Sequence, residues 1–128
     1  MNKYLIDTTF LVDHLRGNSK TGQFLEKEEP YVSTVTIAEL IQGARNKEEL
    51  AIVKKIYKNV NEIYIDKNIS KKAITFLQEL NLSSGLLFLD ALIAATAIEN
   101  KLVLVTKNIK HFKDIPTLQV VPQETFFK

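Results

Sequence analysis

The chain is predicted to fold as an α/β protein, a three-layer α/β/α sandwich around a central, mainly parallel sheet of four or five strands. Short apolar runs alternate with segments whose apolar residues recur at helical spacing, an order typical of parallel strands joined by right-handed crossovers. Residues 102–105 are continuously apolar, as in strands buried on both faces. With 128 residues, 45% of them hydrophobic and 25% charged, the composition predicts a single domain over residues 1–128.

The first thirty residues predict a strand and two helices. Residues 4–6 are apolar and end at Asp7, and apolar side chains at helical spacing then predict a helix from residue 8 or 9. A polar, glycine-containing stretch breaks that helix. Ser19 is a suitable N-cap for a short helix that ends by Pro30.

A second strand is expected at residues 31–33, followed by a helix that opens at Thr34 or Thr36. Its apolar residues recur every three or four positions, and it carries Glu39. Residues 47–59 are charged and amphipathic, which favours a helix lying on the surface.

Alternation at residues 63–65 predicts a third strand, and Asp66 or Asn68 can cap the helix after it. That helix is expected to end near Gly85. The next segment is strongly apolar and contains Asp90, so we expect a buried helix with a carboxylate where water is scarce.

The last strands are expected at residues 102–105 and, at an edge of the sheet, 118–121. Ligands of open parallel sheets bind at the carboxyl ends of the strands. Asp7 follows one such end and residues 106–108 follow another, so a functional site is expected there.

Three carboxylates, Asp7, Glu39 and Asp90, lie in similar apolar surroundings but are too far apart in sequence for one local loop. If the fold gathers them, their charges repel unless a divalent ion neutralises them. A ligand set made of oxygens favours Mg²⁺ or Mn²⁺, and such an ion assists phosphodiester hydrolysis.

Each carboxylate also has a purely structural explanation. Asp7 can cap the helix that follows it, and Asp90 can cap a helix beginning at Ala91. Glu39 lies three residues after Thr36, the spacing of a capping box. Spacing alone leaves both explanations open at each position.

Taken together, four segments resemble the PIN-domain ribonucleases, specifically the VapC-type toxins of toxin–antitoxin pairs. They occur in order at residues 5–13, 35–43, 89–95 and 104–112, so the resemblance runs nearly from end to end. It implies a PIN-like fold and a metal-dependent endoribonuclease that is normally dimeric and is inhibited by a cognate antitoxin.

The resemblance assigns the catalytic positions to Asp7, Glu39, Asp90 and Asn108, with the first three as metal ligands. Asn108 replaces an acid that is frequent in the family, so one Mg²⁺ or Mn²⁺ ion is a safer expectation than two. Thr9 and Thr106 match hydroxyl positions that hydrogen-bond acids or water, although a turn cap is an alternative for both.

Arg16, Arg45 and Lys107 are candidates for binding RNA phosphates, and transfer RNA is a candidate substrate by resemblance only. Surface solubility is the competing role for these side chains. His14 and His111 have no serine or cysteine arranged as a partner, which argues against histidine catalysis. The net charge of +2 does not by itself indicate nucleic-acid binding.

The chain has no cysteine, which excludes disulfides and thiolate zinc sites and is compatible with the cytoplasm. Neither a signal peptide nor a membrane span is expected. Aspartyl-phosphate phosphatases and receiver domains also end a strand in aspartate, but the second acid that each requires is missing. The remaining rival is a PIN-like, non-catalytic module that binds RNA or protein.

Overall fold

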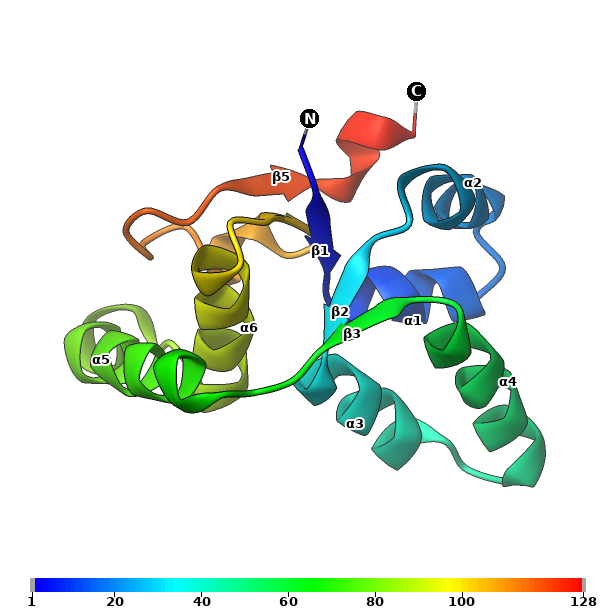
Figure 1. The fold of residues 1–128 in the computed structure, drawn as a ribbon, viewed down its shortest axis with the longest axis horizontal. Helices are drawn as coiled ribbons and strands as arrows, with labels where there is room; N and C mark the ends of the chain where they lie inside the picture. Colours follow the sequence, from blue (N-terminus) through cyan, green and yellow to red (C-terminus); the bar gives the residue numbers. More distant parts are fainter. Residues whose placement is uncertain (1, 128) are drawn as a thin grey trace.

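In the computed structural model, which describes residues 2–127, five strands form one sheet and six α-helices cover it (Figure 1). In chain order the elements are β1 (Tyr4–Ile6), α1 (Thr8–Leu15), α2 (Ser19–Glu28), β2 (Tyr31–Ser33), α3 (Thr34–Gly43), α4 (Lys47–Lys58), β3 (Asn61–Ile63), α5 (Lys67–Ser84), α6 (Phe88–Glu99), β4 (Val103–Thr106) and β5 (Val120–Pro122). Two short 3-10 helices, Ile109–His111 and Gln123–Phe126, precede and follow β5. The strand order is β3-β2-β1-β4-β5 and every pairing is parallel, so the predicted fold class is confirmed.

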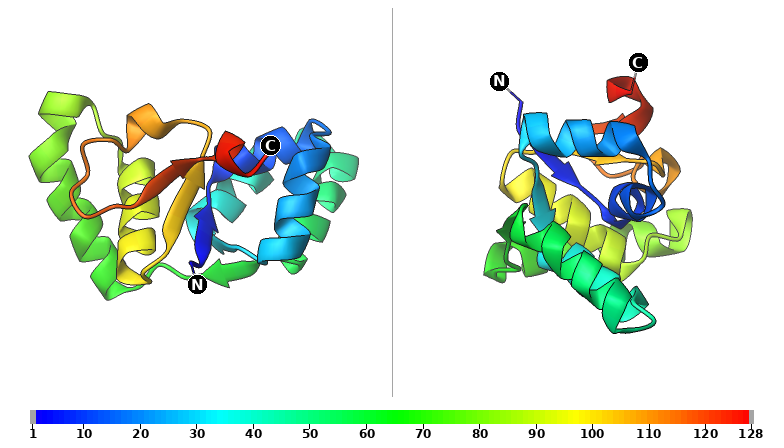
Figure 2. Two further views of the ribbon diagram at one scale, coloured as in Figure 1. Left: turned by 90° about the horizontal axis from the view of Figure 1, so that it is seen from above. Right: turned by 90° about the vertical axis from the view of Figure 1, so that its right-hand side faces the viewer.

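The sheet separates two apolar cores because successive side chains of a strand point to opposite faces. Leu5 and Leu104 face the core formed with α5 and α6. Ile6 and Val105 face the core formed with α1 to α4. The two groups of helices lie on opposite sides of the strands in Figures 1 and 2. Strands β1 and β4, at the centre of the sheet, are therefore buried on both faces.

Two of the expected helix boundaries coincide with the structure. Asp66 caps α5 by accepting a 2.9 Å hydrogen bond from the Ile69 amide. Gly85 ends the same helix with a φ of 71°, a left-handed conformation that glycine adopts without a steric penalty. Among the described helices, none has the length and apolar character needed to cross a membrane.

The structure corrects the N-cap expected for α2 and settles the start of α3. Asn18, not Ser19, caps α2, since its side chain accepts a hydrogen bond from the Lys20 amide. α3 begins at Thr34, the first of the two expected starts, and Ser33 caps it by accepting from the Val35 amide. In both cases a side chain one residue earlier satisfies the first free amides of the helix.

The third strand lies at Asn61–Ile63, two residues earlier than expected. Its register with β2 pairs Tyr31 with Asn61 and ends at Ser33, so pairing cannot continue past Ile63. The next two residues leave the sheet, and Tyr64 is 72% exposed. Pairing partners, rather than local alternation, set this boundary.

The last two strands, by contrast, begin later than expected, at Val103 and Val120. The Leu102 amide bonds to the carbonyl of Ala97 and thereby belongs to the end of α6. β5 pairs only with β4 and lies at an edge of the sheet, as expected.

Candidate active site

Asp7 is the innermost of the predicted site residues. It directly follows β1, whose last residue Ile6 pairs with Val105 of β4, so Asp7 lies level with Thr106. The residue is buried, with 3% of its surface exposed. It also caps α1, because Oδ1 accepts a hydrogen bond from the Phe10 amide. Asp7 therefore both caps α1 and lies at the carboxyl end of β1, where ligands of parallel sheets bind.

Two hydroxyl groups hold the Asp7 carboxylate. Thr9 Oγ1 donates to Oδ1 at 2.7 Å, and Thr106 Oγ1 donates to Oδ2 at 2.6 Å. Burial raises the pKa of Asp7 above its ordinary value, while the bonds from Thr106, Thr9 and the Phe10 amide oppose that rise. These donors stabilise the ionised form of a carboxylate that has little contact with water.

The same hydroxyls fix the loop that leaves β4. Thr9 Oγ1 accepts a bond from the Lys107 amide, and Thr106 Oγ1 accepts one from the Asn108 amide. The backbone at Asn108 is thereby held next to Asp7, whereas the Asn108 side chain is exposed. Thr9 and Thr106 contact the acid directly, the arrangement that the resemblance implied.

Glu39 lies on α3, and the capping box expected with Thr36 is wrong. Thr36 lies inside the helix, and its buried hydroxyl has no hydrogen-bond partner. Instead, Glu39 Oε1 accepts a 2.5 Å bond from Thr8 Oγ1, at the start of α1. A contact between two helices, and not a local cap, orients this carboxylate.

Asp90 lies in the first turn of α6, which begins at Phe88 and not at Ala91. The capping role weighed for Asp90 is therefore wrong, and no side chain caps this helix. The carboxylate is half-buried, and its Oδ2 lies 3.7 Å from Nδ1 of His111. Burial raises the pKa of Asp90; His111 opposes this, while the charges of Glu39 and Asp7 add to it.

Asp7, Glu39, Asp90 and Asn108 line one pocket of about 390 Å³, together with His111. Its walls come from the ends of β1 and β4 and from α3 and α6. Oxygen donors of this kind suit a hard cation such as Mg²⁺. Across residues 2–127, however, no group of three Asp, Glu, His or Cys side chains is placed so that it could hold an ion. The ligand chemistry fits a metal, and three-ligand coordination stays a prediction.

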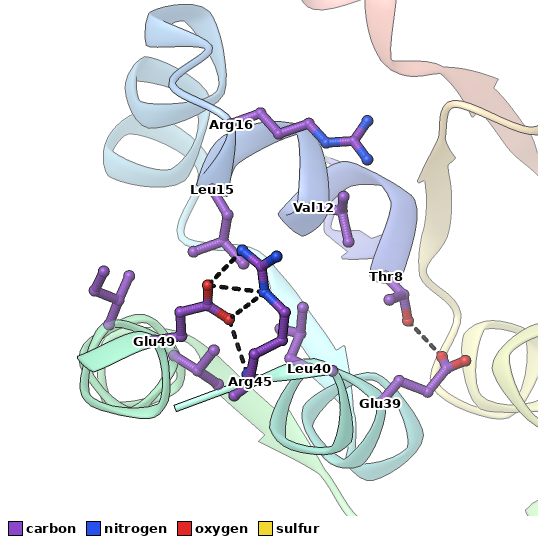
Figure 3. A pocket seen from close by; sticks show the side chains of 12 residues that line it. Thr8, Val12, Leu15, Arg16, Glu39, Leu40, Arg45 and Glu49 are labelled. Carbon is purple, nitrogen blue, oxygen red and sulfur yellow. Dashed lines mark hydrogen bonds and ion pairs between the residues drawn. The ribbon is translucent and has the colours of Figure 1, made fainter. Parts of the chain in front are cut away.

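The three basic residues expected to bind RNA differ in their surroundings. Arg16 is exposed at the end of α1. Lys107 Nζ lies 3.6 Å from Oδ1 of Asp13. The guanidinium of Arg45 forms a pair with Glu49 at 2.8 Å, shown in Figure 3. Their role in RNA binding stays a prediction.

A second cavity of about 440 Å³ runs between α1, α3 and α4 (Figure 3). Its walls include the apolar side chains of Leu15, Leu40 and Ile52, and Ile52 is 51% exposed. Thr8 and Glu39 line this groove as well as the acidic pocket. The two cavities therefore meet at the Thr8–Glu39 hydrogen bond.

Sequence reasoning missed Thr8 and argued against His111 as a catalytic group. Thr8 directly follows Asp7, but no spacing pattern signals that its hydroxyl reaches a side chain 31 positions away. His111 is exposed at the rim of the pocket, beside Asp90. Its place after the strand at residues 103–106 was the one signal that could have indicated the pocket.

The chain is a parallel α/β/α sandwich in which a buried aspartate follows the central strand. Two more acids line the same pocket. These features define a class of α/β proteins with an acidic site at the carboxyl ends of the strands. The chain belongs to the PIN-domain family, whose profile matches residues 4–118. It is 35% identical over 121 residues to ribonuclease VapC19 of Mycobacterium tuberculosis, a match covering 90% of this chain and 96% of that protein. The resemblance to VapC-type PIN-domain ribonucleases is thereby confirmed.

Solved structures agree with this family. A chain of a toxin–antitoxin complex from Klebsiella pneumoniae is 30% identical, with a TM-score of 0.77 over 93% of this chain and 96% of that one. A chain in the DNA-bound VapBC structure from Salmonella typhimurium superposes with a TM-score of 0.86 over 96% of this chain and 99% of that one. At 22% identity the second match demonstrates a shared fold.

Proposed function

We propose that this chain is a metal-dependent endoribonuclease that hydrolyses RNA phosphodiester bonds as the toxin of a toxin–antitoxin pair. One observation carries the proposal. Asp7, Glu39 and Asp90, from three elements distant in sequence, line a single pocket in a chain 35% identical to a VapC ribonuclease. The charges of Glu39 and Asp7 raise the pKa of Asp90, and acids with perturbed pKa values cluster at functional sites.

Asp7, Glu39 and Asp90 would hold one Mg²⁺ or Mn²⁺ ion. Such an ion supplies Lewis-acid polarisation of a phosphate oxygen and lowers the pKa of a bound water. Thr9 and Thr106 fix Asp7 and favour its ionised form by donating to both of its oxygens. Asn108 contributes a neutral amide at the pocket, which favours one ion over two.

RNA would approach over the rim of this pocket. Lys107 directly follows β4, which ends at the pocket, and Arg16 lines the adjoining groove; both are exposed cations whose charge would attract phosphates. Arg45 becomes available for the same role only when it leaves Glu49. Transfer RNA remains the candidate substrate.

A cognate antitoxin would bind in the groove between α1, α3 and α4. The groove is partly apolar, carries charges of both signs and opens into the acidic pocket at Glu39. A segment lying in it would block the pocket without entering the core. Related chains occur in VapBC and toxin–antitoxin complexes, which supports a partner of this class.

A homodimer would bury the apolar side chains that surround the start of α6. Leu82 is 98% exposed, Leu87 64% and Phe88 46%. Exposed apolar side chains at the end of α5 and the start of α6 would form such an interaction surface. We place the protein in the cytoplasm, with its RNA substrate and its antitoxin.

Cleavage of a labelled RNA pool tests the proposal. The full chain should cleave it in Mg²⁺ or Mn²⁺, and EDTA or Asp90→Asn should abolish cleavage. Asp114→Asn, which removes an exposed acid outside the pocket, should leave it unchanged. A folded protein that cleaves no RNA with either ion but still binds RNA or a protein partner would instead support the non-catalytic PIN-like module, to which the neutral Asn108 lends some support.

A further inference from the structure

Thr8 and Thr34 occupy the same position in two successive strand-to-helix turns. Each is the first residue of its helix, α1 or α3, and each donates its hydroxyl hydrogen to a glutamate far along the chain. Thr8 Oγ1 lies 2.5 Å from Glu39 Oε1, and Thr34 Oγ1 lies 2.7 Å from Glu62 Oε2. Only the first of these bonds borders the acidic pocket. The fold therefore provides an internal control for the hydroxyl of Thr8.

Thr8 is the one side chain found bonded to Glu39 within residues 2–127. None of the ion pairs in this part of the chain includes Glu39. Arg45 lines the same groove but donates from its amide, Nε and Nη2 to Glu49. The orientation of the Glu39 carboxylate thus depends on one hydroxyl group.

Glu39 lies at the junction of the acidic pocket and the groove, so its carboxylate can point into either cavity. Asp7 and Asp90 line the pocket and repel a further carboxylate there, while Arg16 lines the groove and attracts one. Without the bond to Thr8, electrostatics would draw Glu39 toward Arg16.

We propose that Thr8 is a positioning residue that keeps the Glu39 carboxylate at the acidic pocket, where it is available to a divalent cation. This inference rests on the proposed metal-dependent function. Groups that orient a metal ligand through a hydrogen bond affect metal affinity by about 10- to 100-fold. Thr8→Val, which keeps the shape of the side chain and removes the donor, should weaken cation binding by about tenfold or more.

Calorimetric titration of the full chain with Mn²⁺ alone tests this inference without any measurement of activity. Thr8→Val should lose affinity, Thr8→Ser should bind as the wild type does, and Thr34→Val should keep wild-type affinity. Thr34→Val removes the corresponding threonine–glutamate bond, together with a longer 3.3 Å contact of the same hydroxyl with the Ile63 carbonyl. A fall in thermal stability common to both valine variants therefore separates folding from metal binding. If Thr8→Val does not fold, Thr8→Ala removes the same donor and takes its place.

Unchanged Mn²⁺ affinity in Thr8→Val, or an equal loss in Thr34→Val, would overturn the role of Thr8 and leave the proposed ribonuclease standing. A wild-type chain that binds no Mn²⁺ would contradict metal dependence itself, and the role of Thr8 with it. The two failures are therefore distinguishable in one set of titrations.

Discussion

Thr106 Oγ1 lies 2.6 Å from Oδ2 of Asp7 and donates a hydrogen bond to it between the two central strands of the sheet. The two residues are 99 positions apart in sequence. Thr106 is fully buried and Asp7 nearly so. A charged group in such a place is costly unless donors compensate for the lost water.

Removing this donor should destabilise the fold. Thr106→Val leaves one oxygen of a buried carboxylate without its side-chain partner, and we expect the free energy of unfolding to fall by about 1–3 kcal/mol. Urea denaturation at neutral pH measures the change. Wild-type stability in Thr106→Val would mean that Asp7 does not depend on this bond.

Asp7 should make the stability of the fold depend on pH in a definite direction. Because burial raises its pKa in the folded state, its contribution to stability is fully present below the unfolded pKa and is lost as pH rises through the folded pKa. Lowering the pH from about 7 toward about 4 should therefore stabilise the wild type relative to Asp7→Asn. A difference in unfolding free energy that stays constant with pH would contradict the assignment.

His14 should make the stability of the fold depend on pH in the opposite direction. Thr21 Oγ1 donates its single hydrogen to the Asn18 carbonyl, so His14 Nδ1, 2.8 Å from that hydroxyl, must be the donor between them. Burial lowers the pKa of His14. The contribution of His14 to stability is fully present above the pKa of the unfolded state. It is lost as the pH falls through the pKa of the folded state.

The stability advantage of the wild type over His14→Gln should accordingly shrink between about pH 7.5 and about pH 5.5. Chemical denaturation of both proteins across that interval measures it. An advantage that grows on acidification would show that the imidazole is stabilised in its charged form.

The antitoxin groove and the dimer surface should be separable by two charge insertions. Ile52 is 51% exposed in the groove, and Leu82 is 98% exposed at the end of α5. Ile52→Glu should weaken antitoxin binding, because it places a carboxylate in an apolar contact where water cannot solvate it. The same variant should leave the mass of the protein in solution unchanged. Leu82→Glu should shift the mass toward a monomer and leave antitoxin binding unchanged.

Each of these two variants is the control for the other. Light scattering gives the mass, and titration with the purified antitoxin gives the affinity. If both variants lose both properties, the two surfaces are not independent, and the placement of the partners is wrong.

Much of the fold was predictable because buried positions recur at regular spacing in strands and helices, and apolar residues occupy them. β2 and β4 are short apolar runs that end in a polar residue, and β1 is one that a polar residue follows. Asp66 and Gly85 bound α5 through local hydrogen bonding and backbone conformation. β3 was displaced because Asn61 pairs with Tyr31, a long-range register that no local alternation reveals. α6 starts at Phe88 without a side-chain cap, so no capping residue in the sequence marks its true start.

The candidate site was predictable at the level of residue types and their order along the chain. Its contacts were not, because Glu39 bonds to Thr8 and not to Thr36, three residues away. A capping box and a bond between helices have the same local sequence, and tertiary packing decides between them. His111 comes near Asp90 only through the way the loop after β4 folds over α6.

The most direct test of the acidic pocket is anomalous diffraction from a crystal of the full chain grown with Mn²⁺. The account predicts one manganese peak in the pocket, contacted by carboxylate oxygens of Asp7, Glu39 and Asp90. An ordered crystal with no peak there, or with manganese bound only elsewhere, would contradict it.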